Sequence, residues 1–351
     1  MGFHLLVLNP GSTSTKVAVF EDGSVSRSEV LRHDAESLHR FPRIWDQFDF
    51  RLKVTREWAM REGDRYNVVI SLGGLLKPVQ GGTYTVNAQM IADARANLQG
   101  EHASNLGCAL ADTLGHEFSC PALVADPVSV DEFEPLARYS GHPLLKRSSL
   151  SHALSIHAAA ERAAVELNLA PSRASFIVAH LGGGISIAPV SGGKIIDVND
   201  ASSDGPFSPE RTGGLPLQQF ITLCYSGTYT EQEMRKLVMG NGGLLAYLGT
   251  NSAMDVEERI ASGDREAKEV YEAMGYQIAK EIGAMAAVLK GKFQGIVLTG
   301  GLASSSLLMK SIVDRIAFLG PVFIYPGEDE MRSLALAALH VLRGDIQPLV
   351  Y

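Results

Sequence analysis

The chain is organised around the stretch Leu5-Leu-Val-Leu-Asn-Pro-Gly-Ser-Thr-Ser-Thr-Lys-Val-Ala-Val-Phe20, in which two apolar runs flank a short polar turn. Residues 5–8 and 17–20 are too few for helices and rich in branched side chains, so they predict two paired, buried strands. Pro10 and Gly11 predict a tight bend between these strands.

The turn carries the donors that an anion needs. Its hydroxyl groups, its backbone N–H groups and Lys16 suit a cluster of anionic oxygens, for which a nucleotide phosphate is the strongest common candidate. A Ser/Thr-rich hairpin turn with a solvated lysine explains the same residues, so the turn alone leaves both interpretations open. The spacing is not that of a Walker loop, in which a glycine-lysine pair opens a helix.

Composition narrows the class of protein. A chain of 351 residues with a formal net charge of −8 predicts two domains and argues against a nucleic acid or an anionic membrane as the main partner. Its three cysteines lack the CxxC spacing of a zinc site and favour reduced thiols in a cytoplasmic protein. We expect no signal peptide and no membrane span.

The opening pattern returns in Phe176-Ile-Val-Ala-His-Leu-Gly-Gly-Gly-Ile-Ser-Ile-Ala188. In each copy an apolar run ends in a polar residue, Asn9 or His180, and a glycine-containing turn leads into a second apolar run. A repeated hairpin predicts two similar domains, 1–171 and 172–351, whose turns line a cleft. The closing helix is expected to pack back on the first domain, and chance similarity of two hairpins is the alternative.

Strands, glycine turns and helices alternate along the chain, which predicts an α/β fold. Further strands are expected at 25–31, 68–71, 122–125, 194–198, 295–299 and 322–325. Helices are expected at 41–62, 87–98, 103–116, 216–225, 230–239, 252–262 and about 264–290, and after Gly301 and Glu328. Ser148 or Ser149 is expected to cap a helix that carries His152 and His157.

Two further positions predict ligand contacts. Asp126 follows the strand 122–125, at the end where α/β sheets place their ligands, although a surface aspartate before Pro127 is the other interpretation. Gly300 and Gly301 lie between a strand and a helix that begins with serines, which favours an anion or a nucleoside.

Together these segments resemble the acetate and butyrate kinases, within the sugar kinase, Hsp70 and actin superfamily, over nearly the whole chain. Asn9–Lys16 resembles the first signature of that family, and His180–Gly184 resembles the second. The butyrate kinase branch is favoured by Gly73–Pro78, Glu101–Gly107, Asp126-Pro127, Ser140–Pro143 and Pro206–Arg211. The resemblance implies duplicated ribonuclease H-like (actin-like ATPase) domains with ATP in the interdomain cleft.

The resemblance also implies a reaction, namely reversible phosphoryl transfer between ATP and butyrate or a branched short-chain acid, giving an acyl phosphate and ADP. Its small-molecule carboxylate substrate would be bound by a homodimer or higher homo-oligomer. The alternatives are an acetate or propionate kinase, an ATP-binding homologue with weak or lost kinase activity, and a sugar kinase of the same superfamily. Sugar recognition usually needs a cluster of polar side chains that is not evident beside the first turn.

Site residues follow from the same resemblance. The resemblance implies that Asn9 and, through water, Glu330 hold Mg2+, with Glu328 the weaker claimant. Catalysis is assigned to Arg211, His180 and His152 around the transferred phosphoryl group and to Asp126 beside the attacking carboxylate. The ATP side is lined by Ser12, Ser14, Lys16, Gly182, Gly183, Gly184, Gly242, Gly243, Gly300 and Gly301. His180 and His152 also fit hydrogen-bonded structural histidines.

The chain departs from the family pattern at one point. Butyrate kinases usually carry an arginine just before the glycine pair that is here Gly73-Gly74, and this chain has Leu72 there. An arginine would bind the acid's carboxylate through charge-assisted hydrogen bonds. The departure predicts weak binding of butyrate, or a longer or branched acid held mainly by apolar contact.

Overall fold

A computed structural model describes residues 2–327 and 329–351 of the chain. Its contacts divide the chain into two compact units, one ending at Asp131 and completed by Asp329–Tyr351, the other formed by the residues between. The division comes earlier than the boundary expected at residues 171 and 172. The physical reason is that helix α5 (Ala153–Glu166) packs on strands β7 (Ser175–Leu181) and β10 (Gly295–Gly300) of the second unit.

Among the described residues of the first unit, seven strands form one sheet in the order β12-β5-β6-β4-β1-β2-β3. They are β1 (His4–Pro10), β2 (Ser14–Glu21), β3 (Ser24–Arg32), β4 (Val68–Leu72), β5 (Thr83–Thr85), β6 (Ala122–Ala125) and β12 (Leu349–Val350). Strand β1 pairs antiparallel with β2 and parallel with β4, and β4 is parallel to β6. The predicted hairpin is confirmed, and the parallel strands bring their carboxyl ends to one edge.

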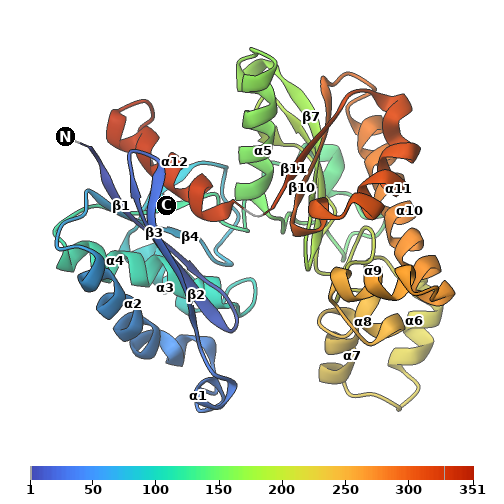
Figure 1. The fold of residues 1–351 in the computed structure, drawn as a ribbon. Coiled ribbons are helices and arrows are strands. Elements are labelled where there is room, and N and C mark those ends of the chain that lie inside the picture. Colours follow the sequence, from blue (N-terminus) through green and yellow to red (C-terminus); the bar gives the residue numbers. More distant parts are fainter. Residues whose placement is uncertain (1, 328) are drawn as a thin grey trace. The chain divides into compact units, whose positions relative to one another are not determined.

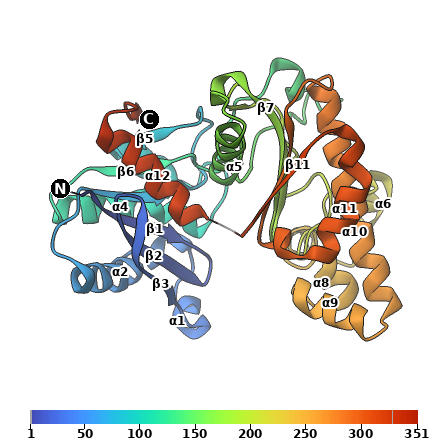
Figure 2. The ribbon, with the colours of Figure 1, turned by 45° about the horizontal axis from the view of Figure 1, so that its top comes forward.

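Helices cover both faces of this sheet, which explains why β1 is an unbroken apolar run. On one face, Leu6 and Leu8 share a core with Leu52 of α2 and Leu110 of α4, while α12 packs on β1 and β4 from the other face (Figure 2). The helices are α1 (Ala35–His39), α2 (Phe48–Glu62), α3 (Ala88–Arg95), α4 (Gly107–Glu117) and α12 (Glu330–Arg343), with 3-10 turns η1 (Ile44–Gln47) and η2 (Ala103–Leu106).

In the second unit, the strands have the order β11-β10-β7-β8-β9. Strand β7 pairs antiparallel with β8 (Ile185–Ser191) and parallel with β10, which is parallel to β11 (Val322–Pro326). This is the pattern that β1 shows with β2 and β4, so the predicted duplication is confirmed. The third strand of the repeat, expected over 194–198, is the shorter β9 (Lys194–Ile195).

Helices α10 and α11 lie on one face of the second sheet and α5 lies on the other (Figure 1). The helices that follow β9 are α6 (Leu217–Cys224), α7 (Glu231–Val238), α8 (Gly243–Leu248), α9 (Ala253–Ala261), α10 (Arg265–Val288) and α11 (Ser306–Ile316). The short α8 was not predicted, because glycines surround its start. No helix in the described ranges is long and apolar enough to cross a membrane.

Candidate active site

Asn9, near the end of β1, lies beside Glu330, although the two residues are far apart in the sequence. Asn9 is 7% exposed, and its Nδ2 donates a hydrogen bond to Oε2 of Glu330 at 2.6 Å. Glu330 is the first residue of α12, which packs on β1. The two predicted Mg2+ ligands therefore lie side by side in the first unit. Glu328, the weaker claimant, lies outside the described residues.

The turn between β1 and β2 is closed by a hydrogen bond from the N–H of Gly11 to the carbonyl oxygen of Ser14 at 2.8 Å. Ser12 is exposed, whereas Ser14 and Lys16 are half-buried. The predicted phosphate-path residues thus lie in the short turn after β1 and in the first residues of β2.

Arg51 of α2 is the functional candidate that sequence reasoning missed. It is fully buried, and its guanidinium donates to the carbonyl oxygens of Gly11, Ser12 and Ser14 at 2.8, 3.0 and 3.1 Å. It also donates to Oγ1 of Thr15 at 3.2 Å. One signal was available, because position 51 falls on the apolar face of the predicted helix, where arginine is out of place.

His33 supports the same turn from β3's end. Its N–H bonds to the carbonyl oxygen of Thr13 at 2.9 Å, and its Nε2 lies 3.0 Å from Oγ1 of Thr15. Burial, and then the positive charge of Arg51, lowers the pKa of His33 to about 4. A neutral ring leaves Nε2 able to accept the Thr15 O–H while that oxygen accepts from Arg51.

Asp126 follows β6, at the same edge of the sheet as Asn9, the last residue but one of β1. Its φ of 37° lies in the left-handed region, which non-glycine residues adopt at a cost in free energy. The N–H of Gly82 donates to its Oδ1 at 2.7 Å. This conformation occurs both at functional sites and in ordinary turns, so it agrees with the ligand interpretation of Asp126 and with the surface one.

Leu72 ends β4 between these two positions and is half-buried. Lys77 follows in the sequence, but its Nζ lies 4.0 Å from the ring centroid of Tyr351, and the Tyr351 hydroxyl accepts from its backbone N–H at 3.2 Å. The cation–π contact keeps Lys77 on the closing residue of the chain. Lys77 therefore does not replace the missing arginine.

In the second unit, the two predicted histidines form a stacked pair. The ring centroids of His152 and His180 are 4.2 Å apart, with planes inclined by 18°. His180 lies on β7 and is 2% exposed. Ser186 of β8, which sequence reasoning missed, orients the partner ring, because its Oγ lies 2.9 Å from Nδ1 of His152. His152 itself is the N-cap residue of α5, so the expected cap by Ser148 or Ser149 is wrong.

Arg211 lies against the glycine turn that follows His180. Its Nη1 donates to the carbonyl oxygen of Ala201 at 2.9 Å, and a Cβ added to Gly184 would overlap the guanidinium. Burial lowers the pKa of Arg211, while Glu210 and Asp200 act in the opposite direction. Glycine at 184 is needed for this approach, so the two motifs form one cluster.

Gly242 and Gly243 lie on the other side of the Arg211 loop. The N–H of Gly242 donates to the carbonyl oxygen of Glu210 at 3.1 Å, and Gly243 has a φ of 60°. A Cβ on Gly243 would overlap the backbone oxygen of Ser208. Their close packing supports the shape of the loop that carries Arg211.

Gly300 and Gly301 differ from each other in their surroundings. Gly300 has a φ of 94°, and a Cβ there would overlap the backbone of Leu181, whereas nothing lies within 4 Å of a Cβ on Gly301. The glycine pair does not lead directly into an α-helix, because the 3-10 turn η5 (Gly301–Ser304) precedes the N-cap residue Ser305 of α11.

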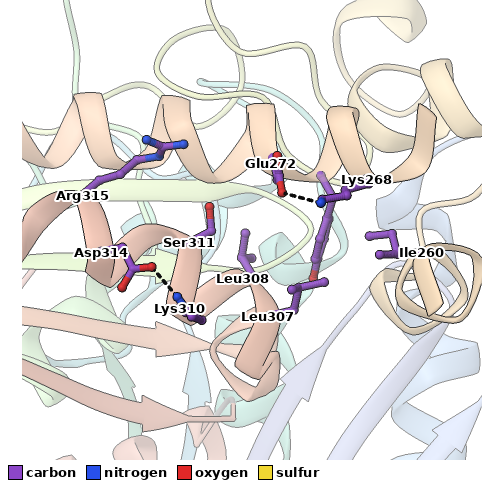
Figure 3. Close-up of a pocket in the computed structure, with 10 residues that line it drawn as sticks. Ile260, Lys268, Glu272, Leu307, Leu308, Lys310, Ser311, Asp314 and Arg315 are labelled. Atoms are coloured by element: carbon purple, nitrogen blue, oxygen red, sulfur yellow. Dashed lines mark hydrogen bonds and ion pairs between the residues drawn. The ribbon is translucent and has the colours of Figure 1, made fainter. Parts of the chain in front are cut away.

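A hollow of about 450 Å³ lies between α9, α10 and α11 in the second unit (Figure 3). Ion pairs at its rim join Nζ of Lys268 to Glu272 at 3.8 Å and Nζ of Lys310 to Asp314 at 2.6 Å. Tyr271 lines it and donates to Oγ of Ser305 at 3.1 Å. None of the predicted site residues lines this hollow, although α11, which forms part of it, follows the glycine pair in the chain.

The donor set at Asn9 and Glu330 fits Mg2+ bound together with phosphates. An amide oxygen and a carboxylate are hard ligands, and Mg2+ usually takes one or two such protein groups and completes its shell with water and substrate phosphates. Within the described part of the chain, no three His, Cys, Asp or Glu residues are grouped to hold a metal ion by themselves.

Two sheets with the same hairpin pattern, each ending in a polar or glycine-rich turn, define a duplicated actin-like fold of the kind found in phosphotransferases. The model of the acetokinase family matches residues 141–326. The chain belongs to the acetokinase family.

Two curated relatives match this chain over all or nearly all of its length. It is 50% identical over 353 residues to the probable butyrate kinase 2 of Caldanaerobacter subterraneus subsp. tengcongensis, covering 99% of each chain. It is 48% identical over 356 residues to butyrate kinase 2 of Clostridium acetobutylicum, covering all of both. The crystal structure of Porphyromonas gingivalis acetate kinase is 18% identical, with a TM-score of 0.79 over 97% of this chain and 100% of that one, which confirms the expected fold.

Proposed function

We propose that this protein transfers a phosphoryl group reversibly between ATP and a short-chain carboxylate, butyrate or a branched acid, giving an acyl phosphate and ADP. The names of the two relatives support the substrate class. The observation that carries the proposal is the cluster of Arg211 and the stacked pair His152 and His180 around the turn 182–184. A coupled assay of acyl phosphate formation over C2 to C6 acids tests it.

Charge accounts for the roles we propose in the second unit. Phosphoryl transfer needs positioning and stabilisation of charge on the equatorial oxygens, with little covalent work by the protein. A half-buried guanidinium contributes more there than one in water, because its field is less screened. We propose that Arg211 stabilises the charge on the phosphoryl oxygens. The two imidazoles would form hydrogen bonds with the same phosphoryl group.

The first unit supplies the other proposed contacts. Ser12, Ser14 and Lys16 take the phosphate side of the turn, and Asp126 stands beside the acid. We propose that Asn9 and Glu330 hold Mg2+, Glu330 through water. A bound Mg2+ would neutralise phosphate charge.

Replacing Asn9 by alanine raises the Mg2+ concentration needed for half-maximal activity, on the order of tenfold, because a ligand and its partner's hydrogen bond are lost together. The check is an Mg2+ titration at saturating ATP. Asn67→Ala is the matched control, since Asn67 accepts from His4 at the opposite end of β1. An unchanged titration in Asn9→Ala removes Asn9 from the metal site.

The alternatives make different predictions in the same assay. An acetate or propionate kinase would prefer C2 or C3 acids, and an ATP-binding homologue without chemistry would bind ATP and form no acyl phosphate.

The nucleoside is proposed to lie beside Gly301, because a Cβ built on this glycine would have no atom within 4 Å.

We further propose a homodimer or higher oligomer that works in the cytoplasm. Helix α6 and its C-cap residue expose Leu217, Ile221 and Tyr225 at 71%, 49% and 87%, an apolar surface that association would cover. Light scattering coupled to size-exclusion chromatography measures the assembly. The three cysteines are free thiols, which agrees with a reducing compartment.

A further inference from the structure

Arg51 has partners that differ from those of most buried arginines. Its described hydrogen bonds go to three carbonyl oxygens of the turn 11–14, to the Thr15 hydroxyl and, from Nε, to Oε1 of Gln47 at 2.9 Å. All of these acceptors are neutral. The oxygens of the turn and of Gln47 thus all bind one guanidinium, and this arrangement fixes the backbone of the turn.

The geometry of the peptide bond determines the direction in which the N–H groups of the turn point. In a trans peptide unit, the C=O of one residue and the N–H of the next point in opposite directions. Arg51 holds the C=O groups of Gly11 and Ser12, so the N–H groups of Ser12 and Thr13 point away from the guanidinium. The face of the turn opposite α2 therefore presents backbone donors, which is the arrangement that binds anionic oxygens.

Charge acts in the same direction. Burial lowers the pKa of Arg51 to about 10, so the guanidinium stays protonated at neutral pH. Among the described residues its hydrogen-bond partners are neutral dipoles and none is a carboxylate, so its positive charge leaves a positive potential at the turn. A lysine would keep the charge but not the planar guanidinium that reaches five oxygens.

From these contacts we propose that Arg51 is a positioning residue for the nucleotide phosphates, which orients the donors of the turn 11–14 and adds positive potential without touching the nucleotide. The inference rests on the proposed function, because that function assigns the turn to the phosphate path. It adds the residue that shapes the turn.

The test compares Arg51→Met and Arg51→Lys with two control variants on the same helix. Leu52→Ala opens a cavity in the core that Leu52 shares with β1, and Arg56→Met removes an arginine whose Nε bonds to Glu117 at 2.8 Å away from the turn. Kinetics with ATP and acid varied separately are combined with thermal unfolding of each variant.

We expect both Arg51 variants to raise the KM for ATP by about tenfold or more, because charge-assisted hydrogen bonds that shape the site are lost, and to leave the KM for the acid unchanged. Leu52→Ala should lower the unfolding temperature without changing the KM for ATP. Arg56→Met should change neither. An unchanged KM for ATP in Arg51→Met, or an equal rise in Leu52→Ala, overturns the proposal.

Chemical rescue supplies a second readout. Arg51→Ala leaves a buried gap, and added guanidinium at millimolar concentration should restore part of the ATP affinity, whereas methylammonium should not. Calorimetric titration with ATP, without acid, separates the two proposals. A wild type that binds ATP but phosphorylates no acid contradicts the proposed function, while unchanged ATP affinity in every Arg51 variant contradicts this inference.

Discussion

Arg211→Ala lowers kcat by about a thousandfold and leaves ATP affinity within a few-fold of wild type, by analogy with other arginines that stabilise phosphoryl transfer. The reason is that negative charge on the phosphoryl oxygens must be stabilised most in the transition state. The phosphoryl oxygens need the guanidinium most as the group detaches, so the interaction contributes to the transition state more than to binding. Its partial burial against Gly184 strengthens the effect, since water screens the guanidinium less there than at the surface.

Two further variants make this experiment decisive. Arg211→Lys keeps a charge but not the fork and should fall between wild type and Arg211→Ala. Arg259→Ala is the matched control, because Arg259 also donates to a backbone oxygen, that of Leu248 at 2.8 Å, and lies outside the proposed site. If wild type and Arg211→Ala have the same kcat, Arg211 takes no part in the mechanism.

Local pattern was enough to predict the two hairpins. Leu5–Phe20 and Phe176–Ala188 each contain both strands and their turn, so the signal and the structure lie in the same short segment. Their recurrence predicted the duplicated fold for the same reason. The domain boundary was not local, because it depends on where α5 packs, and periodicity places a helix without naming the sheet that it covers.

The residues of the candidate site also differ in how far local sequence signals could identify them. Asn9 and Glu330 are named together by the family resemblance, but the hydrogen bond between them depends on the packing of α12 on β1. Arg51 was missed because its contacts join α2 to a turn that precedes it by more than thirty residues. Ser186 was missed because a serine in a strand gives no local signal of the histidine that it orients.

Leu72→Arg is expected to lower the KM for butyrate by about ten- to a hundredfold if the wild type binds that acid weakly, because a bidentate contact with the carboxylate is charge-assisted. The position suits the test. Leu72 ends β4 between β1 and β6, and its register partner Ala125 directly precedes Asp126. Lys77 is held on Tyr351 and does not supply the charge.

The wild-type preference decides which form of the prediction applies. A high KM for butyrate with recovery in Leu72→Arg identifies the missing arginine as the cause. A low KM for a longer or branched acid, lost in Leu72→Arg, identifies Leu72 as an apolar contact with the acyl chain. Leu75→Arg, the same change three residues further on, should give neither effect, since the side chain of Leu75 lies toward Gly100. A wild type with a low KM for butyrate that Leu72→Arg impairs means that another group binds the carboxylate.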